Sequence, residues 1–277
     1  MKLLIAEHSA YAATGGRTHE AGRPLAVFIH GAGMDHQAWA LQTRWLAFHG
    51  WNVLAVDLPG HGHSEGPLLD SIGAMADWIL ALLATVGAHE ATLIGHSMGS
   101  LVALEAAARG AARIQHLVLI GSAARMQVHP DLLAAAAANQ QAAIDMVNLW
   151  GYGYAAGLGG SAAPGVWMVG ATERILQRAR PGVLYNDLAA CNSYASALQS
   201  AAGVSAATLL ISGERDQMTP LKSAAALAAA LPRASLVKVA GAGHMLMSER
   251  PDDVLAALGT ELRVGARGEP ARAAAST

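Results

Sequence analysis

The stretch LIGHSMGS, Leu93–Ser100, places Ser97 between Gly95 and Gly99. The apolar residues before it are typical of a buried strand, and the residues after it have a helical pattern. A turn that passes directly from strand to helix needs small residues two positions before and after its centre, and the two glycines supply them. Such a turn lifts the serine hydroxyl above the strand end, beside the free N–H groups that begin the helix. The pattern predicts that Ser97 is a nucleophile; a strand–helix turn with a serine N-cap is the alternative.

Short apolar runs recur on both sides of this turn. They consist mainly of Val, Ile, Leu and Ala without polar alternation, which is typical of strands in a parallel sheet that is covered on both faces. The runs are LAVFIHG (25–31), WNVLAVDLPG (51–60), ATLIGHS (91–97), HLVLIGS (116–122), ATLLISGERD (207–216) and SLVKVAGAGH (235–244).

Helical patterns alternate with these runs. Apolar residues from Ile72 to Val86 recur at i, i+3 and i+4 behind Ser71, which is a favourable N-cap. Residues 99–110, 219–232 and 250–263 are also expected to be helical. Since strands and helices alternate, the sequence predicts an α/β fold with a doubly wound, mostly parallel sheet flanked by helices.

The alternation breaks between residues 122 and 204, where no convincing strand is found. Three helical patterns and a glycine-rich link, GYGYAAGLGGSAAPG (151–165), fill this region. The simplest account is a helical insertion that stands over the sheet as a lid. The predicted organisation is therefore a core domain of residues 1–121 and 205–265, a lid of residues 122–204, and a disordered tail of residues 266–277.

Composition narrows the possible functions. The chain has 277 residues, a formal net charge of −2 and one cysteine, Cys191. No basic block suggests nucleic-acid binding, no apolar stretch is long enough to span a membrane, and a thiolate zinc site is excluded. Cys191 is expected to be a small core residue. Neither a metal nor an organic cofactor is predicted. The apolar run Leu3–Ala6 is too short for a signal peptide, so a cytoplasmic protein is expected, and nothing indicates an oligomeric state.

A serine nucleophile requires a base and a third group that orients the base. His244 follows the last apolar run through two glycines, at the same edge of the predicted sheet as Ser97. Asp216 lies just past the preceding run and is the expected acid, with Glu214 as its competitor. The chain order Ser, Asp, His is the one found in α/β-hydrolases.

With these pieces, the sequence resembles the α/β-hydrolase family, in its lid-bearing serine-hydrolase branch. The matching motifs span residues 25–251 and are HGAG, VDLPGHGHS, GHSMG, SGERDQMTP and GAGH. The resemblance implies an oxyanion hole that is formed by the backbone N–H groups of Ala32 and Met98. His30 and His96 are expected to have structural roles. Asp57, His61 and Ser64 are expected to stabilise their loop through hydrogen bonds.

The predicted activity is a serine hydrolase that cleaves carboxylic esters through the triad Ser97, His244 and Asp216 and an acyl-enzyme. A small-molecule ester is the expected partner. C–C bond hydrolysis or a lyase reaction on the same triad is the alternative within enzymes, and a non-catalytic ligand-binding protein is the alternative from another class.

The substrate pocket is expected to be apolar and to favour small-to-medium, mostly neutral, hydrophobic substrates. Arg174, Arg178 and Arg180 could instead receive a carboxylate, although a solvated helix face suits their spacing better. The predicted pocket residues are Met126, Trp150, Tyr152, Tyr154, Trp167, Tyr185, Met218 and Met245.

Overall fold

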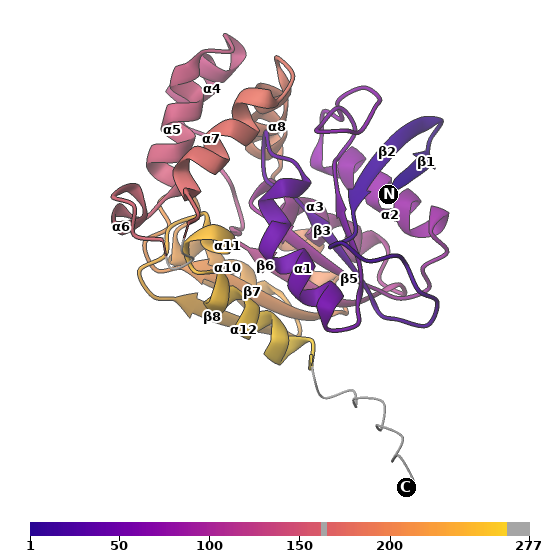
Figure 1. Cartoon of the computed structure of the whole chain (residues 1–277). Helices are drawn as coiled ribbons and strands as arrows, with labels where there is room; N and C mark the ends of the chain where they lie inside the picture. The colour runs from indigo at the N-terminus through magenta and orange to yellow at the C-terminus, as the bar shows by residue number, and fades with distance from the viewer. Residues whose placement is uncertain (162–164, 265–277) are drawn as a thin grey trace, which may run out of the picture.

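An eight-stranded sheet runs through the protein, with strand order β1-β2-β4-β3-β5-β6-β7-β8 (Figure 1). The computed structural model describes residues 1–161 and 165–264. The predicted tail, residues 266–277, lies outside this part of the chain. The strands are β1 (Lys2–Ile5), β2 (His8–Ala13), β3 (Leu25–Ile29), β4 (Asn52–Val56), β5 (Ala91–His96), β6 (Ile114–Ile120), β7 (Ala207–Gly213) and β8 (Ala234–Val239).

The sheet is parallel from β4 to β8, which confirms the predicted fold class. Strands β1 and β2 form an antiparallel hairpin that joins β4, with Ala12 paired to Val56. The sequence analysis missed this hairpin. Its turn residues, Ala6 and Glu7, adopt φ values of 47° and 65°. Hairpin turns with two positive φ values usually contain Asn-Gly or Asp-Gly, so Ala-Glu gives no recognisable signal.

Helices cover both faces of the sheet, and alternate strand residues enter two separate cores. In β3, Val27 and Ile29 face one cluster, whereas Ala26 and Phe28 face the other. This is why the inner strands β3, β4 and β5 lack polar alternation: neither of their faces is exposed to water. The edge strand β8 was also predicted as buried on both faces, but most of its residues are exposed. The covering elements are η1 (His36–Trp39), α1 (Ala40–Phe48), α2 (Ile72–Thr85), α3 (Met98–Arg109), α10 (Leu221–Ala230), α11 (Leu246–Glu249) and α12 (Pro251–Glu261).

The segment between β6 and β7 is helical in its described part. Figure 1 shows α4, α5, α7 and α8 grouped at one end of the sheet, where Leu132, Val147 and Leu176 belong to a third hydrophobic cluster. The last helix of this segment, α9, instead contributes to the cluster that contains Val27 and Ile29. The helices are α4 (Pro130–Ala137), α5 (Gln141–Gly151), α6 (Tyr154–Gly157), α7 (Met168–Arg178), α8 (Val183–Ser193) and α9 (Ala197–Ala202). We call residues 122–204 the inserted segment; its separation as a lid domain stays a prediction.

Across residues 1–161 and 165–264, no helix has both the length and the apolar character that crossing a bilayer requires.

Candidate active site

The turn at Ser97 is as tight as the two glycines suggest. Strand β5 ends at His96, α3 begins at Met98, and Ser97 between them has φ 53° and ψ −120°. A Cβ atom on Gly95 would overlap the carbonyl oxygen of Gly99, and one on Gly99 would overlap that of Ile29. A non-glycine residue at positive φ is a strained arrangement that functional sites often contain.

His244 and Asp216 meet at the carboxyl ends of β8 and β7. The Nδ1 atom of His244 lies 2.9 Å from Oδ2 of Asp216, and both side chains are buried. The second ring nitrogen of His244, Nε2, is buried and has no hydrogen-bond partner in the described part of the chain. His244 and Ser97 line the same cavity. One ring nitrogen of His244 is therefore bound to a carboxylate, and the other ring nitrogen is available.

Asp216 is held as a carboxylate by several donors. The hydroxyl of Thr219 donates to Oδ2 at 2.6 Å, and the backbone N–H groups of Met218 and Thr219 donate to Oδ1 at 2.9 and 2.8 Å. Burial alone would raise the pKa of Asp216, but the charge of His244 and these hydrogen bonds outweigh it and hold the pKa below its usual range.

Glu214, the competitor for the acid, has a different environment. It is exposed, and its carboxylate accepts hydrogen bonds from Nζ of Lys238 at 2.8 Å and from the backbone N–H of Gly241 at 3.1 Å. The hydrogen bond from Lys238 lowers the pKa of Glu214. The structure therefore brings Asp216, and not Glu214, to His244.

The HGAG loop forms a turn next to Ser97. The N–H of Met34 donates to the carbonyl oxygen of Gly31 at 3.1 Å, and Gly33 has φ 72°. A type II turn requires a positive φ at this position. Within residues 1–161 and 165–264, the backbone N–H groups of Ala32 and Met98 have no acceptor. They are therefore free to donate to a substrate oxygen.

His30 and His96 support this region as neutral side chains. Burial and the nearby charge of His61 lower the pKa of His30 to about 4, and its Nε2 accepts the backbone N–H of Leu58. Burial and the nearby charge of His244 lower the pKa of His96 to about 3, and its Nε2–H donates to the carbonyl oxygen of His244 at 3.0 Å. Both arrangements are those of residues that hold loops in place.

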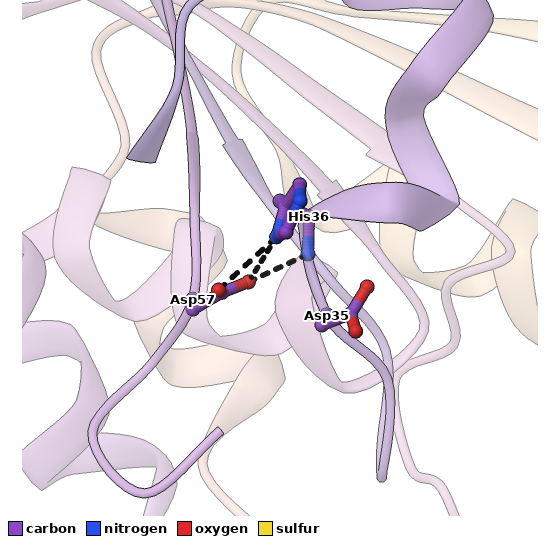
Figure 2. Close-up of side chains that lie close together, drawn as sticks. All are labelled: Asp35, His36 and Asp57. Atoms are coloured by element: carbon purple, nitrogen blue, oxygen red, sulfur yellow. Dashed lines mark hydrogen bonds and ion pairs between the residues drawn. The ribbon is translucent and has the colours of Figure 1, made fainter. Parts of the chain in front are cut away.

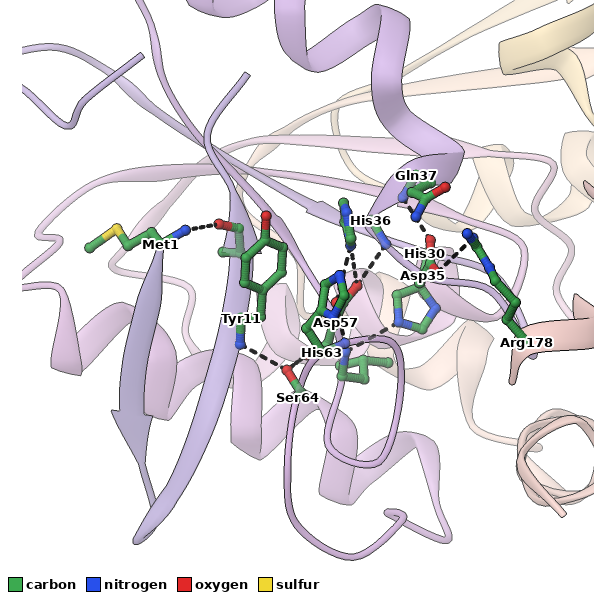
Figure 3. A network of polar contacts seen from close by, with 12 residues as sticks. Met1, Tyr11, His30, Asp35, His36, Gln37, Asp57, His63, Ser64 and Arg178 are labelled. Atoms are coloured by element: carbon green, nitrogen blue, oxygen red, sulfur yellow. Dashed lines mark hydrogen bonds and ion pairs between the residues drawn. The ribbon is translucent and has the colours of Figure 1, made fainter. Parts of the chain in front are cut away.

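Asp57 organises the loop that follows β4 (Figure 2). Its carboxylate accepts hydrogen bonds from the backbone N–H and from Nδ1–H of His36, at 2.7 and 2.8 Å. It also accepts from the N–H of His63 at 2.9 Å. The hydroxyl of Ser64 donates to the carbonyl oxygen of Asp57 and accepts from the N–H of Tyr11 (Figure 3). These hydrogen bonds tie the loop after β4 to β2 and to the loop after β3.

Asp35, His36 and Asp57 place possible metal ligands within 4.8 Å of one another. However, these side chains already form hydrogen bonds and ion pairs with one another and with other residues of the chain. Asp57 and His36 bind each other, while Asp35 accepts the N–H of Gln37 at 2.8 Å and lies 3.5 Å from Arg178 (Figure 3). We therefore assign the cluster to the support of two neighbouring loops.

A cavity of about 770 Å³ opens beside Ser97. Four predicted pocket residues line it: Met126, Trp150, Met218 and Met245. Further apolar residues also line the cavity. The spacing of Leu184 and Leu188, four residues apart on α8, could have indicated a shared helix face. The further apolar residues are Met34, Val128, Leu132, Leu133, Val147, Leu184 and Leu188.

Four other predicted pocket residues do not line this cavity. The hydroxyl of Tyr152 is buried inside the inserted segment, where it bonds to Thr172 at 2.6 Å. Tyr154 and Trp167 are 76% and 69% exposed, and Tyr185 is also exposed. Aromatic composition indicated that the segment was apolar, but it did not show which helix face would turn inward.

The three arginines also lie away from the cavity. Arg178 pairs with Asp35, Arg180 donates to the carbonyl oxygen of Ser64 at 2.7 Å, and Arg174 contacts Gln177. In the described part of the chain, no Asp, Glu, Lys or Arg lines the cavity.

Known proteins are similar to this chain over most of its length. Residues 26–258 match the model of the alpha/beta hydrolase family. A pimeloyl-[acyl-carrier protein] methyl ester esterase from Aromatoleum aromaticum is 31% identical over 248 residues, covering 83% of this chain and 95% of that protein. The enol-lactonase from Burkholderia xenovorans has a similar structure, with a TM-score of 0.84 and 24% identity, covering 95% of this chain and 100% of that one.

Other relatives match over shorter stretches. A 2-succinyl-6-hydroxy-2,4-cyclohexadiene-1-carboxylate synthase from Salmonella agona is 37% identical over 114 residues, covering 40% of this chain and 41% of that protein. The alignments with three more relatives cover between 28% and 40% of those proteins.

Proposed function

Because this chain belongs to the α/β-hydrolase family, we propose that it is a serine hydrolase that cleaves carboxylic esters of small-to-medium, mostly neutral substrates. One observation carries the proposal. Ser97, on its strained turn, lines the same cavity as His244, whose other side is bound to the buried Asp216. A nucleophile, a base and an oriented carboxylate are the groups that acyl transfer requires.

In the proposed mechanism, Oγ of Ser97 attacks the ester carbonyl while Nε2 of His244 takes its proton. Asp216 stabilises the imidazolium, and the N–H groups of Ala32 and Met98 donate to the oxyanion. The imidazolium then protonates the departing alcohol, which leaves an acyl-Ser97. A water molecule, deprotonated by His244, attacks this ester and releases the acid, and Ser97 recovers its proton.

The cavity supports a neutral substrate. Among the described residues, no Asp, Glu, Lys or Arg lines it, so a charged acyl chain would find none of these ion-pair partners there, and burial of an unpaired charge is unfavourable. Asn192, Gln127 and Gln217 are polar residues among those that line it. The names of two similar proteins, a methyl ester esterase and an enol-lactonase, agree with ester chemistry.

A lyase reaction on the same residues is the second candidate, because one relative is named a synthase. The two reactions differ in their products. An ester hydrolase forms one acid and one alcohol from each ester, and incorporates oxygen from water into the acid. Assay of p-nitrophenyl esters of increasing chain length, with ¹⁸O-labelled water, tests the proposal. A protein that binds these esters without turnover would support the ligand-binding alternative.

The rate should fall on the acid side through one protonation, at His244, because a protonated imidazole cannot accept the serine proton. The pKa of His96 is about 3 and that of Asp216 is lowered, so neither group should contribute in this range. The stabilisation from Asp216 is present above the usual carboxyl range and is lost only as pH falls through its lowered pKa. His30 and His96 act in the opposite sense, because they stay neutral in the folded protein while the unfolded chain takes up protons, so stability decreases as pH falls below the usual histidine range. The loss of activity must therefore be compared with the folded fraction at each pH.

The measurement is kcat/KM for a neutral ester between about pH 5 and pH 9, with the folded fraction followed by circular dichroism. A pH-independent rate in folded protein, with chemistry rate-limiting, would contradict the role of His244.

Trp150→Ala should shift the preference toward longer acyl chains by about 10-fold in the ratio of kcat/KM values, because the cavity gains the volume of the indole ring. Trp167→Ala is the matched control. Trp167 is exposed and does not line the cavity, so its loss should leave the ratio unchanged. Equal shifts in both variants would show that Trp150 does not shape the substrate site.

A further inference from the structure

A buried carboxylate from the inserted segment binds the oxyanion loop. Asp187 lies on α8 and is fully buried. Its Oδ2 accepts the backbone N–H of Gly33 at 2.8 Å, although the two residues are 154 positions apart in the chain. The same oxygen lies 2.8 Å from Nε2 of His61, in the loop that follows β4. One carboxylate oxygen therefore joins three separate parts of the chain.

The His61 ring acts as a double donor in this arrangement. Its Nδ1 lies 3.1 Å from the carbonyl oxygen of Pro59, which can only accept, so Nδ1 carries a proton. Its Nε2 faces a carboxylate and also donates. Burial would lower the pKa of His61, but the charge of Asp187 and the hydrogen bond to it outweigh this and raise the pKa. Asp187 and His61 thus form a buried ion pair in which each charge has a partner.

Gly33 is the residue of the oxyanion loop whose N–H donates to this ion pair. It occupies the third position of the turn closed by Met34 and Gly31, with φ 72°. Type I and type II turns differ by a flip of the central peptide, here the one between Ala32 and Gly33. The N–H of that peptide is the group that Asp187 accepts. A flip would turn the N–H away from Asp187, so the carboxylate favours one form of the turn.

Apolar contacts from the inserted segment reach the same residue. A Cβ atom on Gly33 would lie 2.9 Å from Cδ2 of Leu176 and from Cδ1 of Leu184. The adjacent Ala32 N–H has no acceptor in residues 1–161 and 165–264. It belongs to the preceding peptide, whose orientation type I and type II turns share, so Asp187 can affect it by fixing where the turn lies and not by turning that peptide. The inserted segment therefore contacts the oxyanion loop at Gly33 and also lines the cavity.

We propose that Asp187 is a positioning residue, which holds the oxyanion loop through the N–H of Gly33 so that Ala32 can donate to the reacting oxygen. This inference rests on the proposed ester hydrolysis. A donor that stabilises charge only in the transition state affects kcat more than KM. The inserted segment then contributes to the rate as well as to substrate selection.

Asp187→Ala should lower kcat by about 10- to 100-fold and change KM by less than about threefold. Loss of one oxyanion donor costs about 10²–10³-fold, and a displaced donor should cost less. Inhibition by a trifluoromethyl ketone, which forms an oxyanion adduct with Ser97, should weaken by the same factor as kcat. Its inhibition constant does not depend on the fraction of active protein, so partial unfolding would not change it.

Thr172→Val is the control, because it removes another buried hydrogen bond of the inserted segment, the one to Tyr152. It should lower Tm but leave kcat and the inhibition constant within about twofold, as other stability mutations outside the site do. Asp187→Asn keeps the shape of the side chain and one acceptor oxygen, so it should fold even where the alanine variant does not. Its kcat should be lower than that of the wild type by about 5- to 20-fold.

Unchanged kcat and inhibition constant in folded Asp187 variants would overturn the positioning role while leaving ester hydrolysis intact. A wild-type protein that neither hydrolyses esters nor reacts with a fluorophosphonate at Ser97 would instead overturn the proposed function, and the positioning role with it.

Discussion

Replacement of Ser97 by alanine is expected to lower kcat for ester hydrolysis by about 10⁴- to 10⁶-fold, because no acyl-enzyme can form without its Oγ. The protein should stay folded. Alanine keeps the Cβ atom, so the strain at φ 53° changes little, and the described contacts assign no hydrogen bond to the Ser97 hydroxyl. The comparison requires Tm and the rates of purified wild-type and variant protein on one ester.

Ser235→Ala is a suitable control for this variant, because Ser235 is an exposed residue on β8, away from the cavity. A fluorophosphonate should label wild-type protein and Ser235→Ala, but not Ser97→Ala. Near-full esterase activity in folded Ser97→Ala would exclude the proposed mechanism.

Asp216→Asn is expected to lower kcat by about 10⁴-fold, as in the comparable serine-protease change. The carboxylate orients the His244 ring through the 2.9 Å contact at Nδ1 and stabilises the imidazolium that forms during the reaction. An amide provides neither a negative charge nor two acceptor oxygens. Tm should also fall, because the N–H and O–H donors around Asp216 would then face an NH₂ group.

Glu214→Gln provides the matched change of a carboxylate to an amide two residues away. Glu214 binds Lys238 at the surface, so its replacement should change kcat by less than about twofold. A larger loss of kcat in Glu214→Gln than in Asp216→Asn would mean that Glu214, and not Asp216, is the acid of the triad. Equal large losses would point to a disturbance of the whole loop after β7.

Much of the fold could be predicted because its signals are local. Uninterrupted apolar runs such as Leu25–Ile29 indicate strands that are buried on both faces, and the structure shows them in a parallel sheet. The Ser97 turn could be predicted for a similar reason, since only glycine avoids the close backbone approaches at positions 95 and 99. Residues that follow parallel strands meet at one edge of the sheet, which brought His244 and Asp216 together.

Other features gave no local signal. The turn at Ala6 and Glu7 lacks the usual glycine, and Asn139 separates α4 from α5 with φ 50° inside a sequence that looks continuously helical. Asn139 has a partner that sequence spacing could not show, because its Oδ1 accepts the N–H of Gly182 at 2.6 Å.

The sequence by itself determined the strand and helix pattern, the nucleophile turn and the three candidate triad residues, because backbone sterics and hydrophobic periodicity depend on near neighbours. Only the tertiary structure decided which aromatic side chains of the inserted segment face the cavity. It also decided that Asp187 would bind Gly33 and His61, residues far away along the chain. Such contacts depend on how separately formed helices pack, and a helical pattern leaves the rotation and approach of each helix open.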